Sequence, residues 1–250
     1  MSPSRPAVLL AALSLWGAAP SLAEMPVKME PVVVTATRIE EKVSEQASPV
    51  SVVTREEIEL SGSALVGDAL QGLPGVDIQR KGSPGNMENI KIRGGLASHT
   101  LVLIDGFPVN SPAIDGAYDV STLPVGRFDQ IEVVRGPQSA LYGSNAMSGV
   151  VNFLPPRPEG PARYGVGAAA GSFSTLQWNG FAAGGAGSGG YHLGAGGLTS
   201  DGIHPNDDTS IVSFMGGGDV TVGERNRLHA LVLSTNSDKG VPIDFGTPHD

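Results

Sequence analysis

Several groups of residues in this sequence resemble catalytic motifs, but none has the surroundings that the chemistry requires. Gly185, Gly187 and Gly190 match the letters of the dinucleotide-binding pattern GxGxxG, yet they do not lie between a predicted strand and a predicted helix. The five histidines are scattered without the HExxH spacing of a zinc site, no GxSxG segment is present, and the chain has no cysteine. We therefore expect that the protein is not an enzyme.

One acidic loop holds the residues that most resemble metal ligands. Asp201, Asp207 and Asp208 lie close together in the sequence with Asn206, and calcium binds such oxygen ligands. Their spacing does not match an EF-hand loop, and a hydrophilic exposed loop accounts for the same residues. The three aspartates stay calcium candidates beside that alternative, and no other cofactor is predicted.

The composition narrows the classes of partner. The net charge of −9 argues against nucleic acid, which requires a basic surface on the protein. The 35 glycines and 19 prolines favour turns and short strands over long helices. Beyond the N-terminus no apolar run approaches the ~18 residues of a membrane helix, so any contact with a bilayer core requires β-structure.

The first 23 residues have the pattern of a secretory signal peptide. Arg5 supplies the positive charge, residues 7–15 form a short apolar core, and Ser21-Leu22-Ala23 is a small-x-small cleavage site. The alternative, a buried helix, is disfavoured because Pro20 follows the apolar core. We expect export, with the mature chain beginning at Glu24.

The exported chain divides into four segments by composition. Residues 24–47 are polar with a β-branched island, 48–154 mix strands and short helices, 155–162 form a proline-rich linker, and 163–250 are Gly-rich and alternating. The second segment is long enough to bury its own core.

Strands and two short helices are predicted within residues 48–154. Thr54 and Glu57 have the spacing of a capping box, so a helix should begin after Thr54 and end near Gly62. A second helix is expected over 64–71. Ile90 and Ile92 alternate with Lys91 and Arg93, as in a half-buried strand. The other expected strands are 49–53, one beginning at 76, a central strand at 100–104, 131–134 and 150–153.

The last segment predicts about five strands of roughly ten residues, the length of a tilted membrane strand. Their expected ranges are 162–171, 174–184, 189–199, 209–222 and 225–236. A short turn follows the second strand and the longer loop 201–208 follows the third, the pattern of outer-membrane barrels. A soluble β-sandwich is the alternative for this segment.

Five segments, in order and spacing, resemble the plug domain of TonB-dependent outer-membrane receptors. They are EPVVVTATR (30–38), ALQGLPGVDIQ (69–79), IKIRGG (90–95), LVLIDGFPVN (101–110) and IEVVRGPQSALYGSNAMSGVVNF (131–153). The segment ASHTLVLIDG (97–106) is most similar to the cobalamin transporters, although siderophore receptors share much of it. The resemblance implies an α+β plug domain followed by the first antiparallel strands of a large transmembrane β-barrel, which is incomplete in this chain.

The family resemblance also implies a function and partners. Such a receptor lies in the cell outer membrane, in contact with its lipid, and takes up a scarce nutrient such as cobalamin or a ferric siderophore. The plug closes a barrel of ~22 strands. The inner-membrane protein TonB supplies the energy by pulling on an N-terminal segment, the TonB box.

The TonB box is assigned to residues 30–35. Pro31 favours an extended conformation at Glu30, and the β-branched residues that follow continue it. An extended segment of this kind adds to the sheet edge of another protein through main-chain hydrogen bonds. An edge strand of the plug itself is the alternative. The assigned residues are Glu30, Pro31, Val32, Val33, Val34 and Thr35.

Two plug loops, 81–89 and 107–127, are expected to contact the substrate. They are rich in residues that present hydrogen-bonding groups from a rigid base. The candidates are Ser83, Asn86, Asn89, Asn110 and Tyr118.

Three charged residues are predicted to make polar contacts between plug and barrel. Arg93 and Arg135 each precede a glycine at a strand end, and Glu132 lies near Arg135. A hydrated polar interface would let the plug release under force. Solvated charges at strand ends are the alternative.

The number of strands bears on what this chain does by itself. Residues 163–250 supply fewer strands than a closed barrel, and an open sheet edge is not tolerated in a bilayer. We expect that the 250-residue chain alone does not transport, which a liposome uptake assay tests. The alternative function is a plug-only module that binds ligand or TonB without transport.

Overall fold

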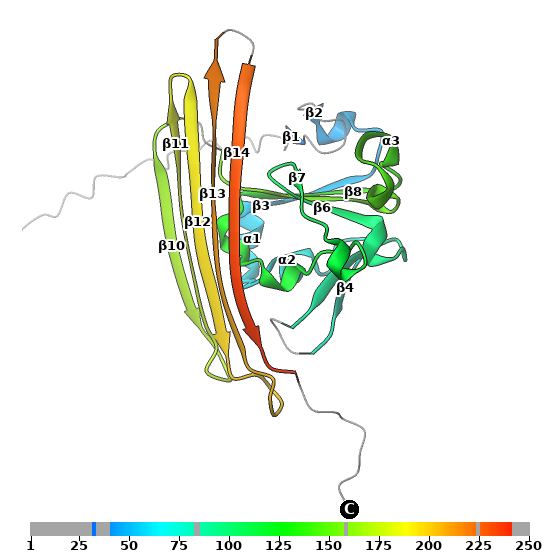
Figure 1. Ribbon diagram of the computed structural model, residues 1–250, viewed down its shortest axis with the longest axis vertical. Coiled ribbons are helices and arrows are strands. Elements are labelled where there is room, and N and C mark those ends of the chain that lie inside the picture. The colour runs from blue at the N-terminus through cyan, green and yellow to red at the C-terminus, as the bar shows by residue number, and fades with distance from the viewer. Residues whose placement is uncertain (1–31, 34–40, 83–85, 158–159, 224–225, 242–250) are drawn as a thin grey trace, which may run out of the picture. The chain divides into compact units, whose positions relative to one another are not determined.

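Two β-structures lie side by side in the computed structural model (Figure 1). One is an α+β domain, residues 50–154; the other is a long sheet, β10 to β14. The described residues are 32–33, 41–82, 86–157, 160–223 and 226–241. The expected signal peptide, Ser83 and the box residues Glu30, Pro31, Val34 and Thr35 lie outside them.

The central sheet of the α+β domain has the strand order β3-β8-β9-β6-β7, in which β6 and β9 are parallel and the other neighbours antiparallel. Phe128 and Phe153 pack with their ring centres 5.4 Å apart in its core. A separate hairpin pairs β4 with β5. The strands are β3 (Val50–Thr54), β4 (Val76–Arg80), β5 (Glu88–Ile92), β6 (Thr100–Ile104), β7 (Phe107–Pro108), β8 (Gln130–Arg135) and β9 (Gly149–Leu154).

Local sequence signals determine where the first helix begins and ends. α1 (Arg55–Ser61) begins with the predicted capping box: the Glu57 N–H donates to Thr54 Oγ1, and the Thr54 N–H donates to Glu57 Oε2 at 2.9 Å. It ends at Gly62, which has a φ of 64°. The remaining helices are α2 (Val66–Leu70), α3 (Ser139–Tyr142) and the 3-10 turns η1 (Val43–Glu45), η2 (Ala97–His99), η3 (Pro112–Ile114), η4 (Val120–Thr122), η5 (Val125–Arg127) and η6 (Ser144–Ala146).

Two predictions for this domain were wrong in detail. α2 is shorter than the expected 64–71, because Leu65 forms a β-bridge with Pro124 and the Val125 N–H bonds to the Ala64 carbonyl. The alternation predicted at 90–93 is confirmed, since Ile90 and Ile92 are buried and Arg93 is exposed, but β5 begins at Glu88, so Asn89, expected in the loop 81–89, is buried in the strand.

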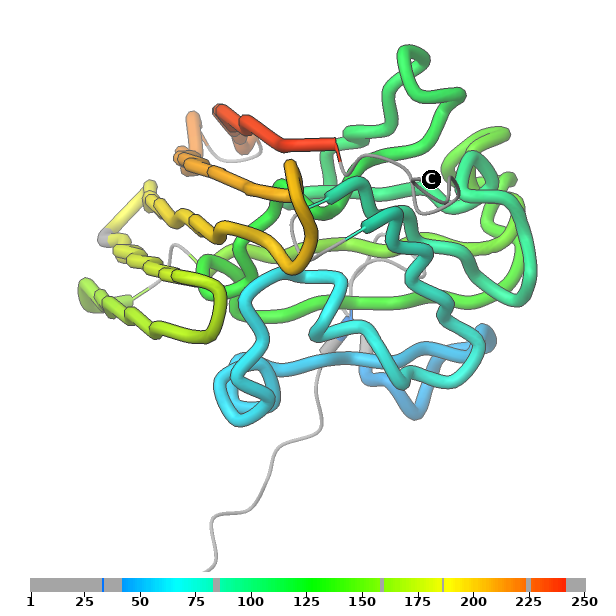
Figure 2. The backbone as a smooth tube through the Cα atoms, turned by 90° about the horizontal axis from the view of Figure 1, so that it is seen from below, coloured from blue at the N-terminus to red at the C-terminus, as the bar shows by residue number. Residues whose placement is uncertain are grey.

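The long sheet contains the five expected strands, each paired antiparallel with the next along the chain. Figure 2 shows them end-on, in a row beside the α+β domain. They are β10 (Arg163–Ala170), β11 (Leu176–Ala186), β12 (Gly189–Ser200), β13 (Thr209–Val222) and β14 (Asn226–Lys239). Among the described residues no helix is both long and apolar enough to span a membrane.

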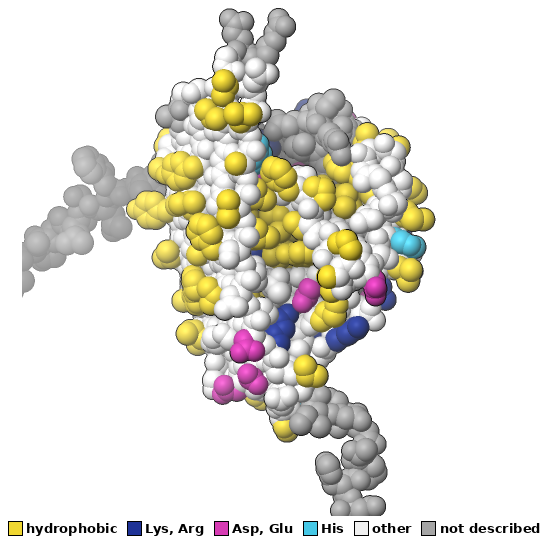
Figure 3. All heavy atoms as spheres, viewed as in Figure 1, with side chains coloured by type: hydrophobic (Ala, Val, Ile, Leu, Met, Phe, Trp, Pro, Cys, Tyr) yellow, Lys and Arg dark blue, Asp and Glu magenta, His cyan; other side chains and the backbone are white. Residues whose placement is uncertain are grey.

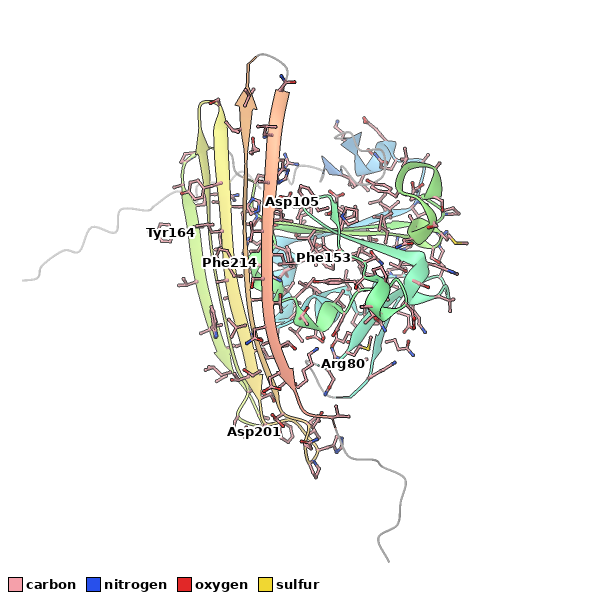
Figure 4. The ribbon with its side chains drawn as sticks, viewed as in Figure 1. Arg80, Asp105, Phe153, Tyr164, Asp201 and Phe214 are labelled. Carbon is pink, nitrogen blue, oxygen red and sulfur yellow. The ribbon has the colours of Figure 1, made fainter. Side chains whose placement is uncertain are left out.

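The two faces of the long sheet differ in character. Alternate residues on the face away from the α+β domain are apolar and exposed, including Tyr164, Val166, Leu193, Phe214 and Val232. Figure 3 shows hydrophobic side chains over this sheet, and Figure 4 labels Tyr164 and Phe214 on it. The opposite face carries Gly194, Gly196, Ser213 and other small residues against the α+β domain.

Loop length separates the two ends of the long sheet. The turn at 187–188 is short, whereas the connections 171–175 and 201–208 share the other end (Figure 1). The loop between β4 and β5 lies at that end too, because Asn86 Nδ2 donates to Asp207 Oδ1 at 2.8 Å. We call this the loop end.

Candidate functional site

The N-terminal segment is extended where the structure describes it. Val32 and Val33 form β1, which pairs antiparallel with β2 (Glu41–Lys42). The side chain of Val33 is buried. These two strands form a sheet separate from that of the α+β domain. Pairing of this segment with another protein, which would require release from β2, stays a prediction.

A buried arginine joins the α+β domain to the long sheet. Arg127, at the end of η5, is fully buried, and its Nη1 donates to Ser213 Oγ of β13 at 2.6 Å. Ser213 Oγ lies 2.8 Å from Thr235 Oγ1 of β14. Burial lowers the pKa of Arg127 to about 10. Sequence reasoning missed this residue because the surrounding Val-Gly-Arg has no motif.

Glycines allow this close approach. A Cβ added at Gly194 would lie 2.9 Å from Arg127 Cβ, and one at Gly196 would lie 3.0 Å from Pro124 Cβ. Carbon atoms pack favourably at about 3.5–4.0 Å. Larger side chains at these positions would therefore push the two β-structures apart.

We expect Gly194→Val to weaken the packing of η5 on the long sheet by about 1–3 kcal/mol, the usual cost of overpacking. Hydrogen exchange across 123–128 would measure the loss of protection. Gly180→Val is the matched control, since a Cβ there meets Val166 at an ordinary 3.5 Å. Equal effects of both substitutions would contradict the explanation.

A second contact between the two β-structures centres on Asp119. Its Oδ1 accepts hydrogen bonds from the Glu88 N–H at 3.0 Å and from Ser121 Oγ at 2.6 Å. Its Oδ2 lies 3.1 Å from Lys239 Nζ at the end of β14. One carboxylate thus links β5, η4 and the long sheet near the loop end.

A third contact brings two imidazoles of the long sheet to one carboxylate of the α+β domain. Asp105 Oδ2 lies 2.7 Å from His229 Nε2 and 3.7 Å from His192 Nε2. Figure 4 labels Asp105 where its domain faces the long sheet. Asp105 has a φ of 51° in the turn between β6 and β7, and Asp-Gly is a pair that favours tight hairpin turns.

A partly buried ionic cluster joins α2, β4 and β5. Arg80 contacts the carboxylate of Glu88, directly opposite it on β5, and its Nη2 lies 2.6 Å from Asp68 Oδ1. Glu88 is fully buried, and burial raises its pKa, although the Arg80 contact acts in the opposite direction. Gly67 leaves room for the Glu88 carboxylate, because a Cβ there would overlap Glu88 Oε2.

The four described substrate candidates differ in what their side chains already bind. Asn86 lies at the loop end but bonds to Asp207, and Asn89 is buried within β5. Asn110 accepts from the Val102 N–H and donates to the carbonyls of Thr100 and Gly116, so its amide holds the chain after β7 in place. Tyr118 packs against the core, and burial raises its pKa. Substrate contact by these residues stays a prediction.

Two of the three predicted plug–barrel residues, Arg135 and Glu132, have partners inside the α+β domain, and Arg93 is exposed. Arg135 Nη2 donates to Ser51 Oγ, and Glu132 is buried and accepts from Gln130 Nε2 at 2.8 Å. Burial, and then the nearby charge of Arg93, lower the pKa of Arg135. Contact of these three residues with a barrel stays a prediction, whereas Arg127, Asp119 and Asp105 make polar contacts with the long sheet that the sequence did not reveal.

The three calcium candidates differ in burial and in hydrogen bonding. The carboxylate of Asp207 is buried and accepts from Asn86 and from the Ile203 N–H at 3.2 Å, which closes its own loop. Asp201 and Asp208 are exposed. Within the described ranges no group of three or more acidic or histidine side chains is arranged to hold a metal ion. Calcium binding gains no support from this geometry.

Comparison with known proteins gives one family and a consistent fold. The family model described as the TonB-dependent Receptor Plug Domain matches residues 42–150. The structure is similar to the pyoverdine outer membrane receptor FpvA of Pseudomonas aeruginosa PAO1, with a TM-score of 0.70 and 17% identity over 84% of this chain and 31% of that chain.

Two further solved receptors have the same fold over this region. The alcaligin outer membrane receptor FauA of Bordetella pertussis gives a TM-score of 0.66 and 25% identity over 82% of this chain and 35% of that chain. The siderophore receptor PirA of Acinetobacter baumannii gives a TM-score of 0.63 and 23% identity over 78% of this chain and 32% of that chain. This chain spans about a third of the length of these receptors.

Proposed function

We propose a function from the premise that this chain carries the plug domain of a TonB-dependent receptor at residues 42–150, followed by antiparallel strands of its barrel, as the sequence predicted. We infer that the whole protein is an outer-membrane receptor that takes up a ferric siderophore with energy supplied by TonB. The observation that carries this is the two-faced long sheet: apolar and exposed on one side, glycine-lined and polar against the α+β domain on the other.

The exposed face suits lipid. Its side chains alternate along strands of 8 to 14 residues, and a tilted membrane strand requires about 9–11. Tyr164, Trp178 and Tyr191 add aromatic groups to this face, and such residues favour the membrane–water boundary. In water this apolar area would be exposed to solvent, whereas outer-membrane lipid would cover it.

The inner face suits a domain that must be held and then moved. Three polar contacts cross the interface. Arg127 contacts a hydroxyl group of the long sheet, Asp119 an ammonium group and Asp105 an imidazole. Water can replace polar contacts of this kind at modest cost as they separate. The paired box at Val33 supplies a short extended segment on which a partner can pull through main-chain hydrogen bonds.

A siderophore is favoured over cobalamin as the substrate. The solved receptors with this fold are named for siderophores: pyoverdine for FpvA, alcaligin for FauA, and siderophore receptor for PirA. The resemblance of 97–106 to cobalamin transporters falls on β6 and the Asp105-Gly106 turn, which serve the core and the interface with the long sheet. Those roles carry no information about a ligand.

Uptake by cells that express the full-length receptor tests this proposal. We expect accumulation of one labelled iron chelate from a siderophore panel, and we expect it to stop when TonB is removed, because the plug then stays in place. Labelled cobalamin is the control substrate. Uptake of cobalamin alone, or uptake that persists without TonB, would overturn the assignment.

A further inference from the structure

A cavity of about 620 Å³ lies at the loop end, between the α1–α2 connection and the ends of the long strands. The α+β domain lines it with Ser63, Asp68 and their neighbours, and the long sheet lines it with Phe173, Thr175, Ser200 and Ile203 among others. Its volume is within the usual range for small-molecule sites, about 300–1,000 Å³. None of the described residues of the loops 81–89 and 107–127, which carry the substrate candidates, lines it.

The turn beside this cavity has an unusual backbone. Phe173 and Ser174 follow one another with φ values of 57° and 52°, and the Thr175 N–H closes the turn on the Ser172 carbonyl at 3.1 Å. Positive φ at both central residues is the mark of tight hairpin turns that favour Asn and Gly. A bulky aromatic residue is unfavourable there. The turn therefore holds Phe173 at a conformational cost.

Neighbouring residues hold this turn in place. The Phe173 carbonyl accepts hydrogen bonds from the Asp201 N–H at 2.9 Å and from Ser200 Oγ at 3.4 Å. Strained residues persist only where the surroundings fix them, and they cluster at ligand clamps. The ring of Phe173 gains little from burial, since 53% of the residue remains exposed at the cavity. Folding alone does not account for this ring.

The lining indicates what kind of molecule fits. Phe173, Leu198 and Ile203 supply apolar surface, and paired hydroxyls face it, with Thr175 Oγ1 and Ser200 Oγ 2.9 Å apart. Asp68 is the ionisable group of the lining, and Arg80 occupies its Oδ1. Oxygen acceptors beside an aromatic ring suit a flat ligand that carries hydrogen-bond donors. A carboxylate on the wall disfavours anions.

We propose that this cavity is a binding site for a small, flat, neutral or cationic molecule, which stacks on Phe173 and donates hydrogen bonds to Asp68 and the hydroxyls of Thr175 and Ser200. The site does not depend on the identity of the transported substrate.

Tyramine is the probe, because it joins one ring to a phenol and an ammonium group, and 4-hydroxyphenylacetate is its control, with the same ring and the opposite charge. The chain is solubilised in dodecyl maltoside micelles, and binding is titrated by saturation-transfer difference NMR. We expect saturable binding of tyramine, roughly tenfold tighter than the anion. No saturable binding, or equal binding of both probes, would overturn the proposal.

Two variants distinguish the contribution of the Phe173 ring to binding from the effect of the strained turn. Phe173→Asn with Ser174→Gly should raise the melting temperature by ~3 °C, because the turn relaxes, and weaken tyramine binding roughly tenfold. Ser174→Gly alone should raise the melting temperature and keep the binding. A double variant that binds as the parent does, or that melts lower than the parent, would show that Phe173 is not a strained ligand clamp.

Discussion

Replacing Arg80 with methionine should lower the free energy of unfolding around β4 and β5 by roughly 3 kcal/mol, the lower end of the cost of breaking a buried ion pair from one side. Methionine keeps the length of the side chain but removes the cation that Asp68 and the fully buried Glu88 share. Two carboxylates would then face each other without compensation. Hydrogen exchange of the β5 amides at increasing urea would report the loss.

Glu88→Gln is the control for this prediction. Burial raises the pKa of Glu88, so its folded form holds a proton more readily than the unfolded chain does. The stability that this group contributes is accordingly fully present below the ordinary glutamate pKa of about 4.3 and is lost as the pH rises through the raised folded value. At neutral pH the glutamine variant should be at least as stable as the parent. A loss as large as that of Arg80→Met would show that the charge of Glu88 stabilises the site at neutral pH, which would contradict its raised pKa.

Replacing Val33 with proline should weaken binding of the periplasmic TonB domain roughly tenfold to a hundredfold, a prediction that rests on the proposed function. Proline removes one N–H from the segment and disturbs the pairing of a strand that must add to a partner sheet. Fluorescence anisotropy with the labelled TonB domain would measure the affinity.

Lys42→Pro is the matched variant for the box. It disturbs the same β1–β2 pairing from the opposite strand and leaves the box intact. Affinity should be equal to that of the parent or up to about tenfold higher, because a larger fraction of the molecules would then present a free box. Equal losses in both variants would mean that β1–β2 pairing itself, rather than the box, supports binding.

Local patterns made much of this fold predictable. The capping box at Thr54 and Glu57 fixed the start of α1, and alternation of apolar and small residues located all five strands of the long sheet. Both signals act between residues close in sequence, where backbone geometry decides the outcome. The family model and the solved receptors agree with the resemblance carried by the motif segments.

The contacts across the interface could not be predicted in the same way. Arg127 reaches Ser213, and Asp119 reaches Lys239, over long stretches of chain. Residue type was misleading too, since arginine and glutamate are rarely buried, yet Arg127 and Glu88 are buried here. Gly194 was predicted only as one residue of a Gly-rich strand, whereas in three dimensions it makes room for Arg127. Such roles depend on tertiary pairing that a single sequence does not encode locally.

The connectivity of the two sheets has a consequence for the order of assembly. In the long sheet every strand pairs with its neighbour in the chain, so hairpins can form one after another with short loops to close. The α+β domain pairs β3 with β8 and sets β6 parallel to β9, so its centre cannot form until β9 is available. Non-local pairing of this kind folds slowly. The newly synthesised chain would therefore have its domain core open while the following hairpins were already able to form, and a chaperone would have most to protect in the residues between β3 and β9.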